Sequence, residues 1–194
     1  MYYFFYPSCL GILTVAGDES HITGLWLAGQ KYFQSTLTGP ALPDPGIPVL
    51  AQARSWLDRY FSGKRPSPAE LPLLPQGTAF RKLVWKELCS IPYGQVTTYA
   101  LLAGRMATLL QKKSMSAQAI GGAVGHNPIS IIIPCHRVVG TDNSLTGYAG
   151  GIENKIRLLQ REGVDTTRFH APATGPTSSR RNARKTKDSG TSTC

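Results

Sequence analysis

The chain has 194 residues, of which 41% are hydrophobic and 16% are charged, and this balance predicts a folded protein rather than a disordered one. The length allows one domain or two small ones with cores of their own. No apolar run approaches the ~20 residues of a membrane helix, and the apolar start lacks the basic leader and cleavage site of a secretory signal. We therefore exclude a membrane-spanning protein and expect a cytoplasmic location.

The formal net charge of +10 is unevenly distributed along the chain. Residues 1–77 contain five Lys/Arg and five Asp/Glu, residues 78–169 contain eleven and five, and residues 170–194 contain five and one. An excess of positive charge confined to the second half favours a polyanionic partner there, with nucleic acid as the first candidate. On charge alone, a basic surface without a specific partner is an equal alternative.

Cysteine and histidine spacing gives no sign of a disulfide framework or of a metal site. The four cysteines lie far apart without a CxxC pair, which predicts free thiols in a reducing compartment: Cys9, Cys89, Cys135 and Cys194. No two of the four histidines have the spacing of metal ligands: His21, His126, His136 and His170. We expect neither a metal nor a cofactor.

The first 77 residues predict an N-terminal α/β domain with a small antiparallel sheet. From Tyr2 to Phe33, short apolar stretches broken by Gly-Asp and Thr-Gly predict a meander of two or three strands. Apolar residues at helical spacing between Val49 and Phe61 predict a helix that Ser62-Gly63 ends. The four prolines of residues 65–77 predict an ordered linker without a regular element.

Residues 78–169 predict a second, mostly helical domain. Thr78 is a plausible N-cap of a first helix, which ends before the breaker sequence IPYG. Thr97 or Thr98 can cap a second helix, YALLAGRMA, and Ser114 or Ser116 a third, AQAIGGAV. The second and third helices together predict a helix-turn-helix. The small residues of the third helix suit close approach to another backbone, or equally well tight packing inside the protein.

The last third of the chain predicts a short strand, a turn, a helix and a basic tail. The run ISIIIPCHRVV, residues 129–139, predicts a short buried strand interrupted by Pro134. After GYAGG, apolar residues from Ile152 to Leu159 predict an amphipathic helix that ends at Glu162-Gly163. Residues 170–194, rich in Ser, Thr, Arg and Lys, predict a disordered tail.

Cys135 is the candidate nucleophile of the chain. A cysteine in an apolar run is usually an inert core residue, but here Pro134 breaks strand pairing before it, and His136 and Arg137 follow at once. A free thiol with a pKa of ~8.5 needs a base to react at neutral pH, and His136 can be that base. Since adjacent strand residues point to opposite faces, this requires a helical turn or a bridging water. From these residues alone, a buried structural cysteine is an equal alternative.

Four segments closely resemble the O6-alkylguanine-DNA alkyltransferases, the methylated-DNA–protein-cysteine methyltransferase family: GHNPISIIIPCHRVVG, TGYAGG, LLQREGV and, upstream, IPYGQVTTYALLA. The resemblance covers residues 78–165 strongly and residues 1–77 in general layout. It implies direct DNA repair, in which the alkyl group of a flipped O6-alkylguanine in double-stranded DNA moves irreversibly to a cysteine of the protein. It further implies a monomer, and it leaves activity toward O4-methylthymine open.

The resemblance assigns catalytic roles to five positions. Cys135 resembles the alkyl acceptor, His136 the base that deprotonates it through a bound water, and Glu162 the group that holds the imidazole. Asn127 resembles the residue that fixes the turn beside the active site, and Tyr99 the donor to N3 of the flipped guanine. Taken singly, each residue favours a plainer interpretation: Glu162 as a surface acid, Tyr99 as a core residue and Asn127 as part of a common turn. The joint match to the family reverses this preference.

Further positions would contact the flipped base. Tyr148 resembles a wall or lid of the base pocket, and the backbone N–H of Ala149 would face O6. The carbonyls of Cys135 and Val138 would accept hydrogen bonds from the exocyclic amine. For Arg137, the resemblance leaves two roles open, structural contacts or contacts with DNA phosphates.

The third predicted helix resembles the family's recognition helix, which enters the minor groove with small residues: Ala117, Ala119, Gly121 and Gly122. Gln118 stands where the family commonly has an arginine that fills the gap left by the flipped base. The run RMATLLQKKSMS is longer than the family's usual connection, and its two lysines can contact phosphates or simply lie in a solvated loop.

Three other functions are weaker alternatives. Alkyltransferase-like proteins bind the same lesions without chemistry, but they replace the acceptor cysteine, and Cys135 stands in place here. A transcription regulator of the damage response would need a further domain, for which 194 residues leave no room. A general thiol hydrolase would have no use for a DNA-binding motif.

Overall fold

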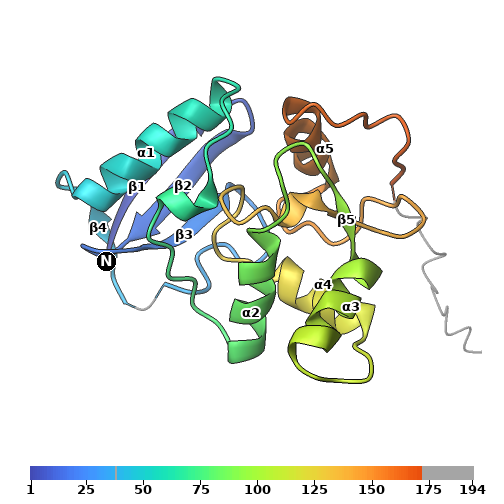
Figure 1. Cartoon of the computed structure of the whole chain (residues 1–194). Coiled ribbons are helices and arrows are strands. Elements are labelled where there is room, and N and C mark those ends of the chain that lie inside the picture. The colour runs from blue at the N-terminus through green and yellow to red at the C-terminus, as the bar shows by residue number, and fades with distance from the viewer. Residues whose placement is uncertain (38, 172–194) are drawn as a thin grey trace, which may run out of the picture.

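The computed structural model describes residues 1–37 and 39–171. In the N-terminal part the elements are β1 (Tyr2–Ser8), β2 (Gly11–Gly17), β3 (Ile22–Leu27), β4 (Leu42–Pro43), α1 (Pro48–Phe61) and a 3₁₀ helix (Pro68–Glu70). The C-terminal part contains α2 (Ala79–Leu88), β5 (Thr97–Thr98), α3 (Tyr99–Leu109), α4 (Ala117–Gly125), a second 3₁₀ helix (Cys135–Arg137), β6 (Val138–Val139) and α5 (Ile152–Arg161). Figure 1 shows the sheet with α1 on one side of the molecule and the remaining helices on the other.

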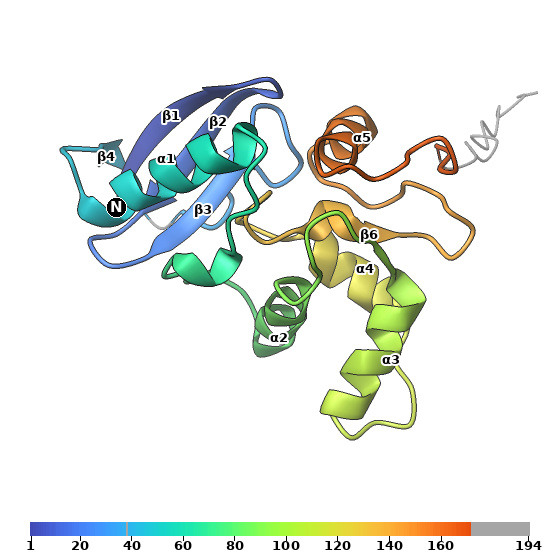
Figure 2. The ribbon, with the colours of Figure 1, turned by 45° about the horizontal axis from the view of Figure 1, so that its top comes forward.

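The N-terminal domain is a small sheet covered on one face by α1. Its strands lie in the order β3-β2-β1-β4, and the first three form the predicted antiparallel meander. The short β4 pairs parallel with β1, which makes the sheet mixed. Figures 1 and 2 show α1 lying across the strands, and its apolar residues are buried there, as their helical spacing predicts: Val49, Leu50, Ala53, Trp56, Leu57 and Tyr60.

The proline-rich segment is more ordered than the sequence predicts. Pro68–Glu70 form a 3₁₀ helix, which Ser67 and Glu70 stabilise through reciprocal side-chain to backbone hydrogen bonds. Farther along, the N–H of Ile22 donates to Pro72 O at 2.8 Å, and the N–H of Leu74 donates to Ile22 O at 2.9 Å. The linker therefore uses backbone groups that β3, an edge strand, leaves free.

The predicted caps of the C-terminal helices are confirmed. The side chains of Thr78, Thr98 and Ser116 accept hydrogen bonds from backbone N–H groups in the first turns of α2, α3 and α4. Of the alternatives that the sequence left open, the caps are therefore Thr98 and Ser116. Helices α3 and α4 pack against each other as the predicted helix-turn-helix. Trp85 of α2 is fully buried, and its indole N–H donates to the carbonyl of Ala123 in α4 at 2.9 Å.

The strand predicted at residues 129–139 is wrong for most of its length. Only Val138–Val139 form a strand, β6, which pairs parallel with β5. Upstream the chain turns: Ile131 has φ 71°, a rare conformation for a β-branched residue, and residues 135–137 form a 3₁₀ helix. Pro134 has no N–H for a ladder, and the Asn127 side chain binds the Ile133 carbonyl at 2.8 Å in place of a neighbouring strand.

The two domains share one hydrophobic core. Its buried residues run without a break from the sheet to the C-terminal helices. The segment before residues 134–137, the PCHR motif, packs on β3. There the N–H of Leu25 donates to Pro128 O and the N–H of Ser130 donates to Leu25 O, both at 2.9 Å. This contact fixes the PCHR motif relative to the N-terminal sheet.

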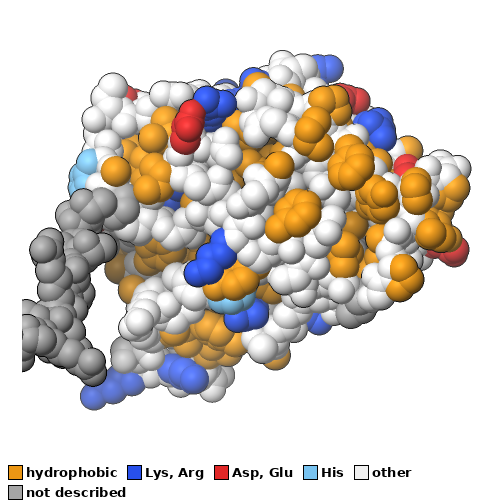
Figure 3. All heavy atoms as spheres, turned by 180° about the vertical axis from the view of Figure 1, so that it is seen from behind, with side chains coloured by type: hydrophobic (Ala, Val, Ile, Leu, Met, Phe, Trp, Pro, Cys, Tyr) orange, Lys and Arg blue, Asp and Glu red, His pale blue; other side chains and the backbone are white. Residues whose placement is uncertain are grey.

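On the surface, basic side chains are spread over the face that Figure 3 shows. In Figure 3 they lie on both the upper and the lower part of this face, whereas the acidic side chains lie mainly in the upper part. No helix among residues 1–37 and 39–171 is long and apolar enough to cross a membrane. Most of the predicted basic tail, from residue 172 on, lies outside the described residues, as does Cys194.

Replacing Trp85 with alanine is expected to destabilise the fold by about 3–5 kcal/mol, because it empties a buried site and removes the hydrogen bond from the indole N–H to the Ala123 carbonyl. Urea unfolding followed by circular dichroism measures this loss. The control is Leu83→Ala on the same helix, where the side chain is 41% exposed, and it should cost less than about 1 kcal/mol. Equal losses in the two variants would contradict the packing described here.

Candidate active site

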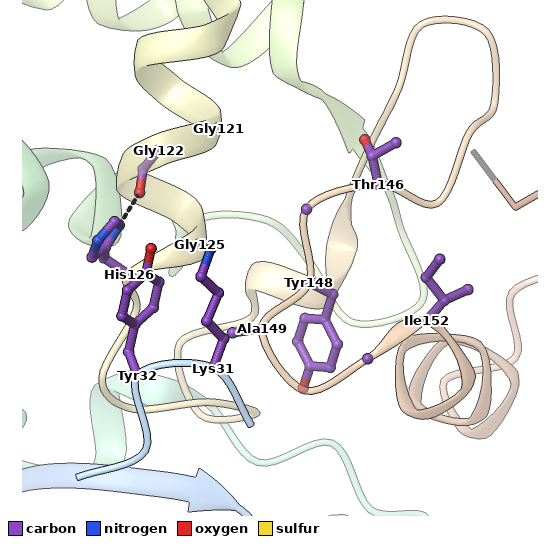
Figure 4. Close-up of a pocket in the computed structure, with 12 residues that line it drawn as sticks. Lys31, Tyr32, Gly121, Gly122, Gly125, His126, Thr146, Tyr148, Ala149 and Ile152 are labelled. Atoms are coloured by element: carbon purple, nitrogen blue, oxygen red, sulfur yellow. Dashed lines mark hydrogen bonds between the residues drawn. The ribbon is translucent and has the colours of Figure 1, made fainter. Parts of the chain in front are cut away.

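A cleft of about 560 Å³ opens between three parts of the chain. Figure 4 shows its walls: the loop after β3 with Lys31 and Tyr32, the C-terminal half of α4 with His126, and the loop of residues 146–152. The Tyr32 ring stacks on the His126 imidazole with 4.0 Å between centroids. The N–H of Lys31 donates to Ala149 O at 3.0 Å. Sequence reasoning gave the N-terminal domain no part in this site.

Cys135 lies behind the cleft, only 4% exposed, and is not among the lining residues. The Asn127 side chain donates to Cys135 Sγ at 3.0 Å and to Ile133 O at 2.8 Å. Burial raises the pKa of the Cys135 thiol, although the Asn127 hydrogen bond and the nearby Lys155 ammonium act in the opposite direction. The resting sulfur is therefore a neutral thiol that needs a base.

Residues 135–137 form a 3₁₀ helix, and this turn directs His136 toward Glu162. A helical turn at this point is one of the two arrangements that the sequence allows for a Cys135–His136 pair. His136 Nε2 lies 2.7 Å from Glu162 Oε1, and both side chains are fully buried. Burial lowers the pKa of His136, which keeps the imidazole neutral. A carboxylate can only accept hydrogen bonds, so Nε2 carries the proton and Nδ1 is the basic nitrogen. Among the described residues, nothing binds Nδ1.

The Glu162 carboxylate accepts five hydrogen bonds. His136 Nε2, Arg137 Nη2 and the Tyr60 hydroxyl donate to Oε1, and Arg137 Nε and the Gly94 N–H donate to Oε2. Burial alone would raise the pKa of Glu162, but the hydrogen bonds and charges of His136 and Arg137 outweigh it and hold this pKa far below its usual value. Glu162 therefore stays ionised and fixes the orientation of the imidazole.

Arg137 is held by contacts inside the protein. Its side chain is 7% exposed, and its guanidinium forms a two-pronged ion pair with Glu162 at 2.7 and 2.9 Å. Its Nη1 donates to Ile91 O at 2.6 Å. These contacts fit the structural role predicted for Arg137. Its second predicted role, contacts with DNA phosphates, stays a prediction.

Two tyrosines lie near the Cys135 sulfur, and one of them, Tyr148, also lines the cleft. The Tyr99 hydroxyl donates to Thr146 O at 2.9 Å, and a Cβ at Gly147 would stand 2.4 Å from that hydroxyl, so only glycine fits there. The Tyr148 ring lies 6.4 Å from the His136 ring, and among the described residues its buried hydroxyl has no partner. Burial, followed by the nearby Cys135, raises the pKa of both phenols, so both stay neutral.

Lys155 is a buried site residue that sequence reasoning missed. Its ammonium donates to Val138 O at 2.6 Å and to Thr146 O at 2.9 Å. Lys155 therefore already binds the Val138 carbonyl, which was expected to accept a hydrogen bond from the flipped guanine. Burial lowers the pKa of Lys155 to about 8, although the nearby Cys135 acts in the opposite direction. Its position on the apolar face of α5, in line with Ile152 and Leu159, was the signal available in the sequence.

The expected DNA-contacting residues lie on the accessible side of α4. Ala117, Gln118, Ala119 and Gly122 are exposed, and Gly121 is half-buried against the Tyr99 ring. Gln118 occupies the first turn, where its backbone N–H is capped by Ser116. Their role in binding DNA stays a prediction. Residues 1–37 and 39–171 contain no group of three His, Cys, Asp or Glu side chains that could hold a metal ion.

Two family models together match most of the chain. A model described as the ribonuclease-like domain of 6-O-methylguanine DNA methyltransferase matches residues 1–75, and one described as the DNA binding domain of the same protein matches residues 79–164.

Several characterised proteins are similar to the chain over most of their length. The methylated-DNA–protein-cysteine methyltransferase of Haemophilus influenzae is 39% identical over 170 residues, covering 84% of this chain and 87% of that protein. The protein of the same name from Methanosarcina barkeri is 42% identical over 163 residues, covering 84% and 97%. The Mycobacterium tuberculosis OGT structure in complex with DNA superposes with a TM-score of 0.72 at 39% identity, covering 89% and 96%.

The variant Glu162→Gln is expected to be less stable than the wild type at neutral pH by about 3–5 kcal/mol, because it leaves the Arg137 guanidinium buried without a counter-charge. The folded-state pKa of Glu162 lies below its ordinary value of 4.5. This carboxylate therefore stabilises the fold above that value and loses its contribution as the pH falls toward the folded-state pKa. The stability of the variant should thus decline less than that of the wild type between about pH 5 and about pH 3.

Urea titrations at several pH values measure this difference. The control is Glu153→Gln, which makes the same change at an exposed carboxylate paired with Arg157. Parallel stability curves for Glu162→Gln and Glu153→Gln would show that the buried carboxylate is not held ionised.

Proposed function

The chain belongs to the 6-O-methylguanine DNA methyltransferase family, and from this premise we propose that it moves the alkyl group of O6-alkylguanine in duplex DNA irreversibly onto Cys135. At the level of the family, it is a methylated-DNA–protein-cysteine methyltransferase, which repairs O6-methylguanine directly. The observation that carries the assignment to Cys135 is the buried arrangement of this thiol, the His136 imidazole and the ionised Glu162.

The proposed proton path starts at the neutral thiol. His136 Nδ1 is the basic nitrogen because Nε2 is bound to Glu162, and it takes the Cys135 proton through a bridging water. Glu162 stabilises the imidazolium that forms. The sulfur then forms a bond to the alkyl carbon while the bond from that carbon to O6 breaks, and the leaving guanine anion takes up one proton. The product is a thioether that water does not cleave, so each chain reacts once.

Asn127 and Tyr99 support the two ends of this reaction. The amide N–H of Asn127 donates to Cys135 Sγ and favours its ionised form. The Tyr99 hydroxyl, which now donates to Thr146 O, turns to N3 of the guanine and stabilises the leaving anion.

The base reaches the sulfur only after two movements. In the duplex, O6 is stacked out of reach of an in-line attack, and flipping the nucleotide out costs a few kcal/mol. In the protein, Tyr148 lies between the cleft and the active-site side chains. Gly147 and Gly151, on either side of it, both have positive φ, and such glycines give a loop the freedom to move. Tyr148 therefore acts as a lid.

Backbone groups around the lid recognise the flipped base in this proposal. The N–H of Ala149 faces O6, and the carbonyls of Cys135 and Val138 accept from the exocyclic amine. The Val138 carbonyl already accepts from Lys155, but a carbonyl oxygen has a second lone pair for the base. Lys155 therefore orients one of the acceptors.

The protein binds damaged DNA through α4 in this proposal. The small exposed residues of α4 approach the minor groove, and Gln118 occupies the gap left by the flipped base. Gln118 can fill this gap and form hydrogen bonds, but it lacks the charge and the planar stack of an arginine. Activity toward O4-methylthymine, a monomeric state, a cytoplasmic location and domain boundaries at residues 77 and 169 stay predictions.

A purely lesion-binding protein is the alternative function. Such a protein would need no acceptor thiol and no base, whereas this chain keeps a thiol hydrogen-bonded to Asn127 and an imidazole oriented by Glu162. The alternative therefore leaves this arrangement unexplained.

Incubation with an excess of duplex DNA containing O6-methylguanine should add the mass of one methyl group to each chain and no more, and peptide mapping should place it on Cys135. Intact-protein mass spectrometry measures the gain. The variant Cys135→Ala should gain nothing, whereas Cys89→Ala should react like the wild type, because burial raises the pKa of Cys89 to about 11 and keeps it inert. Repeated turnover, or transfer by Cys135→Ala, would refute the mechanism.

Replacing Gln118 with arginine should tighten binding to lesion-containing duplex, or speed transfer, by about three- to tenfold, because a guanidinium adds charge and stacking in the gap. Fluorescence anisotropy and single-turnover kinetics measure the two effects. Gln160→Arg makes the same change at an exposed position of α5 outside the cleft and should change neither. If the two variants behave alike, Gln118 does not occupy the gap.

A further inference from the structure

A residue of the N-terminal domain contacts the active-site carboxylate directly. The Tyr60 hydroxyl, at the end of α1, donates to Glu162 Oε1 at 2.9 Å across 102 positions of sequence, and both groups are buried. The same oxygen accepts the proton-bearing Nε2 of His136 at 2.7 Å. Figure 1 shows why this is possible: the C-terminal end of α1 lies on the side of the sheet nearest α5, where Arg161 also donates to Phe61 O at 2.7 Å.

Neighbouring aromatic rings hold the Tyr60 ring in an orientation that points its hydroxyl at Glu162. The Trp56 ring, one turn earlier on α1, stacks on it with 5.4 Å between centroids and 9° between planes. The Tyr93 ring meets it edge-on at 6.1 Å. The Trp56 indole N–H is itself fixed to Ser67 O at 2.9 Å, in the linker. Burial, followed by the Glu162 charge, raises the pKa of Tyr60 well above its usual value, so the phenol stays a neutral donor.

We propose that Tyr60 is a positioning residue of alkyl transfer, through which the N-terminal domain fixes the Glu162 oxygen that orients His136. The proposal rests on the function assigned above, since it gives Tyr60 a role only if His136 and Glu162 act together. The hydroxyl prevents Oε1 from rotating away from the imidazole. It also shares the negative charge of that oxygen, which weakens its pull on the proton of Nε2. The N-terminal domain is thus a working part of the active site.

The groups that surround the His136–Glu162 pair come from each element packed against it. They are Tyr60 of α1, Tyr93 of the loop after α2, Cys135 and Arg137 of the 3₁₀ helix, Tyr148 of the lid and Lys155 of α5. Between pH 5 and about pH 7, the cysteine and the tyrosines stay neutral because their pKa values are raised, and Lys155 stays charged because its pKa is about 8. A shift in the pH profile in this range therefore reports on His136.

The variant Tyr60→Phe tests the proposal, because it removes the hydroxyl and keeps the ring between Trp56 and Tyr93. Single-turnover transfer from saturating lesion duplex should slow by about tenfold, the lower end of what loss of an outer-sphere partner costs. The acid limb of the pH–rate profile should move to higher pH, because an unshared carboxylate oxygen binds the imidazolium more tightly and raises the pKa of His136. Affinity for the duplex should not change.

A matched control is Tyr6→Phe, which removes a hydroxyl bonded to Asp58 at 2.8 Å within the N-terminal domain. It should leave both the transfer rate and the pH profile unchanged. Urea unfolding of both variants reports any general loss of stability. A ring-fluorinated tyrosine at position 60 keeps the fold and is a stronger donor, so it should move the acid limb to lower pH, opposite to Tyr60→Phe.

Failure of this proposal can be told apart from failure of the proposed function by comparing the Tyr60 variants with Glu162→Gln. If Tyr60→Phe and the fluorinated tyrosine leave rate and profile unchanged while Glu162→Gln slows transfer, the proposal is wrong and the His136–Glu162 pair stands. If Glu162→Gln also transfers at the wild-type rate, the proton path itself is wrong. If Tyr60→Phe does not fold, the fluorinated tyrosine alone decides, and an unmoved acid limb then refutes the proposal.

Discussion

The buried carboxylate of Glu162 is the interaction on which the rest of the structure depends. A charge in a protein interior is costly unless hydrogen bonds and a counter-charge compensate it, and Glu162 receives five hydrogen bonds from four residues, one of them the Arg137 cation. These donors come from the N-terminal domain, the loop after α2 and the PCHR turn. The carboxylate therefore joins the two domains at the point where it also orients the imidazole of His136.

The sulfur that we propose as the alkyl acceptor and the surface that we propose for DNA lie at separate places in this fold. Cys135 and His136 lie inside, where burial keeps both neutral, whereas α4, Lys31 and Tyr32 border the cleft at the surface. The loop of residues 146–151 lies between them. In the proposed function, this loop has to move before a flipped base reaches the thiol. The strained backbone of Ile131, just before the PCHR turn, is held by the contacts of its neighbours with β3.

Local patterns in the sequence predicted what depends on local chemistry. The capping residues Thr78, Thr98 and Ser116 and the helix-turn-helix all follow from neighbours in the chain. The strand assigned to residues 129–139 was wrong because apolar composition alone does not distinguish a strand from a buried turn. The contacts of Tyr60, Lys155 and the loop after β3 were missed because they join residues far apart in sequence, and no periodicity reports such contacts.

The ionisation state of Glu162 is the most direct test of this account. The side-chain carboxyl resonance of Glu162, assigned by its absence in the spectrum of Glu162→Gln, can be followed by carbon NMR from neutral pH down to acid unfolding. The account predicts the chemical shift of an ionised carboxylate for as long as the protein stays folded. A resonance that titrates in the folded protein near the ordinary value of 4.5 would contradict it, because Glu162 would then not be held by its donors.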